Sequence, residues 1–184
     1  MATIAQTRLR SEEIKPKIGS RILNSKEELL SGDLTDDINE LLEQPGVLVF
    51  KKIDFTDEEQ IRFSNLLGGN ATEIGVDGGA IFSISLDEKE HDKAVIDYLK
   101  GSLFWHIDGT MNPVPVRGSI LSSKVLPTWG GNTEFANCYA AYDDLPQAKK
   151  AEIDDLRVIH AMWVSQLYWC PEPTLAQLED WQAK

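Results

Sequence analysis

The residues with the clearest chemical potential are a histidine and an aspartate two positions apart, His106 and Asp108. Side chains at positions i and i+2 of an extended chain point to the same face, so an imidazole nitrogen and a carboxylate oxygen can meet at one point. These groups are two corners of a 2-His-1-carboxylate site, which holds iron(II) and leaves coordination positions open. A His-x-Asp tripeptide also arises by chance as a surface or capping pair, so the pair alone does not establish a metal site.

The other histidines and the cysteines give no comparable signal. The chain holds three histidines, and His91 lies in a charged stretch where we expect a solvated helical residue. His160 lies in an apolar run and is expected to be structural. Cys138 and Cys170 lack the short spacing of a zinc site, and a single pair is not a disulfide framework. We expect two reduced, partly buried thiols.

Several motifs stand in a defined order around the histidine–aspartate pair. Trp105 directly precedes the pair. After the pair come a strand-like segment with Leu-Pro at 120–127, a Gly-Gly-x-Thr loop at 130–133 and an Ala-Tyr-x-x-Leu-Pro helix at 141–146. Together these motifs resemble the taurine/2,4-dichlorophenoxyacetate (TauD/TfdA-like) dioxygenases, which depend on iron(II) and 2-oxoglutarate. The resemblance covers residues 35–165, diffusely over 71–100, and Glu134-Phe135 is most similar to the phenoxyacetate-type members.

By this resemblance, His106 and Asp108 are metal ligands and catalytic residues, and Thr133 contacts the distal carboxylate of 2-oxoglutarate. The histidine must be neutral and the aspartate ionised to bind the metal. A hydroxyl donor suits a carboxylate, whose oxygens only accept, although an ordinary strand threonine would fit the same position. Ser102 and Met111 flank the pair where we expect substrate-binding residues, with plain core packing as the alternative for Met111.

The family also has residues that this chain does not contain. It places a second iron-binding histidine well downstream, followed by an arginine that pairs with 2-oxoglutarate. After Asp108 the only histidine is His160, and no arginine follows it. We therefore expect the N-terminal portion of a longer enzyme, with a natural truncation or strands supplied by another chain as alternatives. We expect this portion alone to bind iron weakly and to be inactive.

The fold class implied by the resemblance is α+β: a double-stranded β-helix (jelly-roll, cupin-like) with helical decoration, incomplete at the C-terminus. The 184 residues suffice for one domain with a sizeable core. We expect a single dioxygenase domain over 1–184, with residues 1–16 loose.

The activity implied by the resemblance is hydroxylation of a small organic acid or related small molecule. Its cofactors and co-substrates are Fe(II), 2-oxoglutarate and O2, and its co-products are succinate and CO2. Sulfonates, sulfate esters and aryloxyacetates are all open as substrates. The alternatives are a catalytically inactive, truncated binding protein of the same fold and an unrelated metal-free α+β domain.

The composition is that of an ordinary soluble globular protein, with 42% hydrophobic and 26% charged residues. No apolar run approaches the roughly 20 residues that span a bilayer, and residues 1–17 lack the apolar region of a secretory signal. We therefore expect a cytoplasmic location and no membrane partner.

The net charge of −12 repels phosphate backbones and argues against nucleic acid as a partner. A small-molecule substrate is the expected partner, and homo-oligomer formation is left open.

Capping signals and apolar periodicity predict the elements that must position these residues. Thr56 and Glu59 fit a capping box for a helix over 56–67, which Gly68-Gly69 ends. Apolar spacing predicts further helices at 34–42, 87–99, 139–145, 147–156 and 175–181. We expect extended segments or strands at 18–23, 47–50, 80–86, 103–107, 118–125, 133–135 and 157–164, of which the wholly apolar run 47–50 is expected to be buried.

Overall fold

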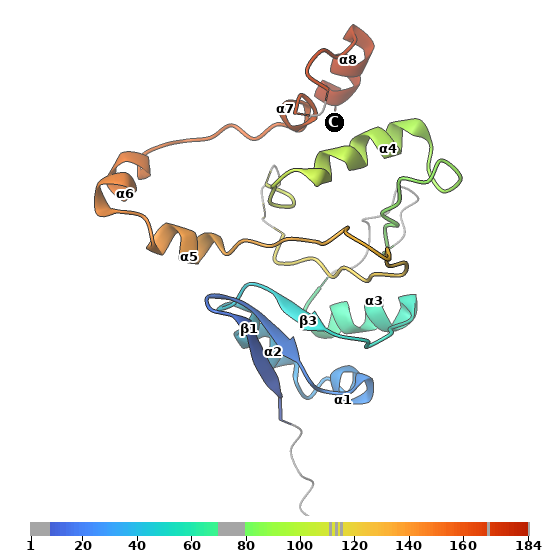
Figure 1. Ribbon diagram of the computed structural model, residues 1–184, viewed down its shortest axis with the longest axis vertical. Helices are drawn as coiled ribbons and strands as arrows, with labels where there is room; N and C mark the ends of the chain where they lie inside the picture. The colour runs from blue at the N-terminus through green and yellow to red at the C-terminus, as the bar shows by residue number, and fades with distance from the viewer. Residues whose placement is uncertain are drawn as a thin grey trace, which may run out of the picture. The chain divides into compact units, whose positions relative to one another are not determined.

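The structure is a computed structural model that describes residues 8–69, 80–110, 112, 114, 116–168 and 170–183. The chain divides into two compact units, one made of residues 1–82 and 120–155, the other of residues 83–119 and 156–184. Figure 1 shows the helices and strands in chain order. A small sheet and several helices make up the described chain, as the α+β class predicts.

A three-stranded sheet in the order β1-β2-β3 opens the first unit. β1 (Ser11–Lys15) pairs antiparallel with β2 (Ile18–Ile22), and β2 pairs parallel with β3 (Leu48–Phe50). The strands expected near 18–23 and 47–50 are thus confirmed. β1 lies inside the stretch 1–16 that we expected to be loose, so that expectation is wrong for Ser11–Lys15; residues 1–7 lie outside the described residues.

The sheet is less buried than the apolar run at 47–50 predicts. Val49 in β3 is exposed, and Leu48 and Phe50 are half-buried. The sheet order makes β3 an edge strand of this three-stranded sheet, and an edge strand has a neighbour on one side only. The expectation of a fully buried strand is therefore wrong.

The core of the first unit forms where three helices pack with the sheet. These helices are α1 (Lys26–Leu30), α2 (Thr35–Leu42) and α3 (Asp57–Leu66). Phe63 of α3 is 2% exposed, and its ring centroid lies 5.4 Å from that of Phe50 and 5.3 Å from that of Phe55. The buried cluster comprises Ile22, Leu29, Leu34, Ile38, Phe55 and Phe63. Burying each such side chain contributes about 1.5–3 kcal/mol.

The start of α3 confirms the predicted capping box. The Thr56 hydroxyl accepts from the Glu59 backbone N–H at 3.2 Å, and the Glu59 carboxylate accepts from the Thr56 backbone N–H at 2.8 Å. Two N–H groups that the first turn would leave without partners are satisfied in this way. α2 confirms the helix expected over 34–42.

The remainder of the first unit is an extended segment followed by two short helices, α5 (Cys138–Asp143) and α6 (Gln147–Ile153). These confirm the helices expected at 139–145 and 147–156. Residues 118–125 and 133–135, all of them described, do not form the expected strands. Lys124 anchors the extended segment through Asp57 at 2.8 Å, and Asn137 donates to the Lys17 carbonyl at 2.6 Å.

The second unit carries α4 (Lys93–Leu99), the 3-10 helix η1 (Lys100–Leu103), α7 (Met162–Gln166) and α8 (Leu175–Ala183). α8 confirms the helix expected at 175–181, and α4 occupies the last part of 87–99. The strand expected at 157–164 is wrong, because 157–161 has no strand pairing and α7 begins at Met162. The strand expected at 80–86 is also not formed.

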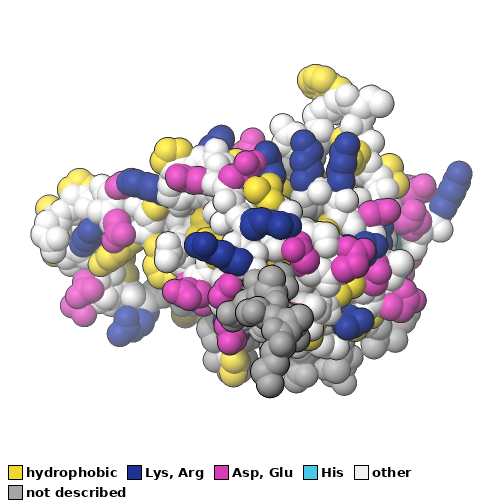
Figure 2. Space-filling view, turned by 90° about the horizontal axis from the view of Figure 1, so that it is seen from below, with side chains coloured by type: hydrophobic (Ala, Val, Ile, Leu, Met, Phe, Trp, Pro, Cys, Tyr) yellow, Lys and Arg dark blue, Asp and Glu magenta, His cyan; other side chains and the backbone are white. Residues whose placement is uncertain are grey.

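Apolar side chains are exposed along the segments that lack strand partners. Trp129 is 92% exposed in the first unit, and Ile159 is 91% exposed in the second. Figure 2 shows apolar side chains scattered among interspersed acidic and basic groups on the face that it displays. Within the described part of the chain, none of the helices has the length and apolar character needed to cross a membrane.

Candidate metal centre

The predicted histidine–aspartate pair lies in the second unit, directly after η1. Nε2 of His106 lies 3.3 Å from Oδ1 of Asp108, and the two side chains are 48% and 59% exposed. Phe104 is extended, with φ −102° and ψ 157°, and a turn begins at Asp108. The side chains come together as the two-residue spacing predicts, although the segment has no strand partner among the residues that the structure describes. Their role as metal ligands stays a prediction.

A backbone carbonyl fixes which ring nitrogen of His106 carries the hydrogen. Nδ1 of His106 lies 2.7 Å from the carbonyl oxygen of Phe104. A carbonyl oxygen only accepts, so Nδ1 carries the hydrogen of this bond. The neutral ring then presents its lone pair at Nε2, the nitrogen that faces Asp108. Metal-binding histidines are commonly oriented by such a bond at the second ring nitrogen.

Asp108 is oriented by a residue that the sequence motifs do not include. The Ser119 hydroxyl donates to Oδ2 of Asp108 at 3.0 Å. The other carboxylate oxygen, Oδ1, faces His106. The two candidate ligands therefore direct one atom each toward the same region.

The turn after Asp108 requires a glycine. Gly109 has φ +66°, a conformation that side chains with a Cβ rarely adopt. Its carbonyl accepts from the Asn112 backbone N–H at 3.0 Å. A Cβ at this position would lie 2.5 Å from Cγ2 of Val116. The Asp-Gly dipeptide is a turn signal that could have identified this residue from the sequence.

The donor set and the spacing fit a single divalent metal ion. Metal–nitrogen and metal–oxygen bonds of about 2.1 Å at a right angle place the two ligand atoms about 3.0 Å apart. The observed 3.3 Å between Nε2 and Oδ1 is close to that separation. Among the residues that the structure describes, no group of three or more His, Cys, Asp and Glu side chains could hold a metal ion. His106 and Asp108 are thus two candidate ligands, and their role stays a prediction.

The other predicted site residues belong to different parts of the chain. Ser102 lies in η1, where its hydroxyl donates to the Leu99 carbonyl at 2.6 Å. Met111 lies outside the described residues. Thr133 belongs to the first unit and is exposed. It follows Gly130 and Gly131, whose φ angles of +70° and +69° fit the predicted turn.

The remaining histidines and cysteines differ in part from expectation. His160 is exposed and lies in a segment without strand pairing, so the expectation of an apolar strand around it is wrong. His91, expected to be a solvated helical residue, is half-buried ahead of α4, and its Nε2 lies 2.9 Å from the Ser83 carbonyl oxygen. Both cysteines are free, and Cys138 is exposed rather than partly buried.

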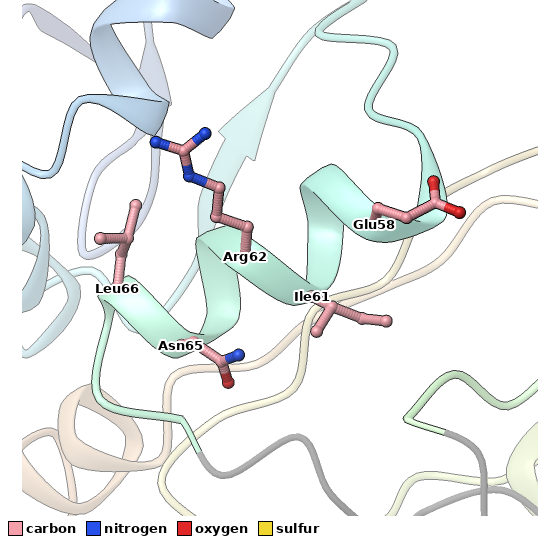
Figure 3. A pocket seen from close by; sticks show the side chains of 5 residues that line it. All are labelled: Glu58, Ile61, Arg62, Asn65 and Leu66. Atoms are coloured by element: carbon pink, nitrogen blue, oxygen red, sulfur yellow. The ribbon is translucent and has the colours of Figure 1, made fainter.

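A separate surface hollow lies along α3 and involves none of the predicted site residues. Figure 3 shows the side chains that line it, which are Glu58, Ile61, Arg62, Asn65 and Leu66. Arg62 donates to the Leu30 carbonyl at 3.0 Å and so ties α3 to α1. The hollow is part of the helix surface and shares no residue with the His106–Asp108 pair.

Comparison with known proteins places these observations in one family. Residues 10–179 match the family described as taurine catabolism dioxygenase TauD, TfdA family. The chain is 34% identical over 121 residues to an (S)-phenoxypropionate/alpha-ketoglutarate-dioxygenase of Sphingobium herbicidovorans, covering 66% of this chain and 42% of that protein. It is 32% identical over 137 residues to an alpha-ketoglutarate-dependent 2,4-dichlorophenoxyacetate dioxygenase of a Burkholderia species, covering 67% and 46%.

A solved structure is also similar to this chain. The crystal structure of AAD-2 in complex with Mn(II) and N-oxalylglycine matches with a TM-score of 0.73 and 26% identity. The match covers 96% of this chain and 64% of that one. The chain spans about half the length of the curated relatives it matches.

Proposed function

The chain belongs to the taurine catabolism dioxygenase TauD, TfdA family, and from that premise we propose that it carries the metal pair of a non-haem Fe(II)- and 2-oxoglutarate-dependent dioxygenase. The proposed reaction hydroxylates a small organic acid or related small molecule, with succinate and CO2 as co-products. One observation carries the proposal: Nε2 of His106 and Oδ1 of Asp108 lie 3.3 Å apart.

His106 and Asp108 are the residues proposed to hold Fe(II). When bound, this metal supplies the oxidising chemistry that couples decarboxylation of 2-oxoglutarate to hydroxylation of the substrate. His106 binds through Nε2, because Nδ1 is engaged by the Phe104 carbonyl. Asp108 contributes a full negative charge, which favours a divalent cation at the pair.

Thr133 is proposed to bind the co-substrate rather than the metal. Its hydroxyl can donate to the distal carboxylate of 2-oxoglutarate, whose oxygens only accept. The preceding glycines have left-handed backbone angles, so the loop turns sharply before the threonine. Ser102 and Met111 remain proposed as substrate-side residues.

The substrate class is proposed from the relatives. Two of them are named for phenoxypropionate and 2,4-dichlorophenoxyacetate, both small carboxylates. The net charge of −12 on this chain does not prevent binding of an anion, because a bound metal ion dominates the local field. An aryloxyalkanoate is therefore the first substrate to test.

The jelly-roll fold is proposed for the whole protein. The extended segments expose large apolar side chains such as Trp129 and Ile159, which strands of a packed sheet would bury. The likeness to AAD-2 supports this arrangement. A single dioxygenase domain over residues 1–184, a cytoplasmic location, a homo-oligomeric state and the lack of nucleic-acid partners stay predictions.

Anaerobic titration tests the proposal on the native protein, after its intact mass has been measured. Addition of Fe(II) and then 2-oxoglutarate is expected to give the visible charge-transfer band of the metal–co-substrate chelate. His106→Ala should abolish the band, and the control His160→Ala should retain it. A native protein that shows no band with both additions would contradict the proposed function.

A further inference from the structure

We propose that Ser119 is a positioning residue that keeps Asp108 a ligand through one oxygen only. The inference rests on the metal site of the proposed function and assigns a role to a residue outside its motifs. The Ser119 hydroxyl donates to Oδ2 of Asp108 at 3.0 Å, while Oδ1 lies 3.3 Å from Nε2 of His106. The two oxygens of the carboxylate thus have different partners.

The number of oxygens that Asp108 offers to the metal decides how many coordination positions stay open. A carboxylate can bind a cation through one oxygen or through both. Binding through both takes two positions, one of which the co-substrates need. A hydroxyl that donates to Oδ2 engages that oxygen and directs Oδ1 to the metal. Ser119 therefore preserves an open position without touching the metal or the substrate.

The local backbone brings Ser119 to Asp108 from 11 residues away along the chain. The left-handed turn at Gly109 directly follows the aspartate, and a Cβ on Gly109 would lie 2.5 Å from Cγ2 of Val116. The hydroxyl–carboxylate bond is charge-assisted, and such bonds are stronger than those between neutral groups. Because Ser119 is exposed, its substitution should leave the folded core intact.

The test uses Mn(II) alone as the probe on the full chain. Electron paramagnetic resonance of free Mn(II) gives the dissociation constant, and water-proton relaxation gives the number of water molecules on the bound ion. Ser119→Ala and Ser119→Val should raise the dissociation constant about 10-fold or more, as loss of a ligand-orienting partner commonly does. Both should also lose water from the bound ion, because Oδ2 becomes free to bind. Ser119→Thr keeps the hydroxyl and should behave like the parent.

Two controls separate the effect of the Ser119 hydroxyl from other effects of the substitutions. Ser123→Ala removes another exposed hydroxyl and should leave Mn(II) binding and hydration unchanged. Threonine and valine have nearly the same shape, so comparison of these two Ser119 variants separates the hydroxyl from packing, even if Ser119→Ala folds poorly. Circular dichroism of each variant checks the fold.

The outcomes distinguish this inference from the function on which it rests. A parent chain that binds no Mn(II), or binds it equally well after His106→Ala, overturns the metal site and the inference together. A parent that binds through His106, with Ser119→Ala and Ser119→Val matching it in affinity and hydration, overturns only the role of Ser119. Equal weakening of Mn(II) binding by Ser119→Thr and Ser119→Val also overturns the role of Ser119.

Discussion

Nζ of Lys26 in α1 lies 2.8 Å from Oε2 of Glu59, the residue that completes the capping box of α3. The same carboxylate accepts from the Thr56 backbone N–H at 2.8 Å. The hydrogen bond from Lys26, followed by the one from the Thr56 backbone, lowers the pKa of Glu59 below its ordinary value of 4.5. One carboxylate therefore joins a helix cap to a neighbouring helix.

This arrangement predicts a specific pH dependence of stability. A carboxylate whose pKa is lowered by folding stabilises the protein above its unfolded pKa, and this contribution is lost as the pH falls through the folded pKa. Glu59→Gln should lower the urea midpoint at neutral pH, and the difference from the parent should disappear as the pH falls below 4.5. Glu58→Gln, in the same first turn, is the matched control and should cost less. A difference that is unchanged at acid pH would contradict the prediction.

The buried aromatic cluster predicts a large effect on stability from one substitution. Phe63 is 2% exposed and packs against two other phenylalanine rings. Phe63→Ala should lower the free energy of unfolding by about 3–5 kcal/mol, because it removes buried surface and leaves a cavity. Phe135→Ala, at a position that is 55% exposed, should change it by much less. Urea unfolding measures both, and similar losses would show that the core lies elsewhere.

The proposed role of Thr133 predicts an effect on the co-substrate alone. Thr133→Val keeps the shape of the side chain but removes the hydroxyl donor. A hydrogen bond to a charged group contributes about 1.5–3 kcal/mol, so the dissociation constant for 2-oxoglutarate should rise about 10-fold or more. Calorimetric titration of the Mn(II)-loaded protein measures this. Thr128→Val is the control in the same loop region, and an unchanged constant for Thr133→Val would remove the residue from the site.

The turn at Gly109 predicts that an added methyl group disturbs the metal pair. A Cβ there would meet Val116 at 2.5 Å, and the φ of +66° is strained for alanine. Gly109→Ala should therefore weaken Mn(II) binding. Gly46 has a similar φ of +68° but nothing within 4 Å of an added Cβ, so Gly46→Ala controls for backbone strain without the clash. Retention of full Mn(II) affinity in Gly109→Ala would show that this turn does not position Asp108.

Local signals account for the elements that could be predicted from the sequence. The capping box of Thr56 and Glu59 and the apolar spacing around Ile38 depend on residues within one or two helical turns, and both helices are confirmed. Strands depend on partners elsewhere in the chain. The residues of β1 are exposed and, apart from Ile14, polar, so they give no periodic signal, and they form a strand because β2 pairs with them. The segment 118–125 lacks a pairing partner among the described residues and does not form a strand.

In the candidate site, too, a contact set by local spacing could be predicted and a contact with a more distant residue could not. The two-residue spacing of His106 and Asp108 suffices to bring their side chains together. The bond from Ser119 joins groups 11 residues apart through a turn, and no spacing rule predicts it. The proposed role of Thr133 rests on the family resemblance, because the geometry of the first unit alone does not suggest it.

The acceptor that orients the His106 ring is a main-chain oxygen of Phe104. No replacement of the Phe104 side chain can delete it, so an alanine scan across this segment would overlook the group that selects Nε2. Replacing the amide that links residues 104 and 105 with an ester would weaken that oxygen as an acceptor. The hydrogen of the imidazole would then no longer be held on Nδ1, and the preference for the tautomer with its lone pair on Nε2 would be lost.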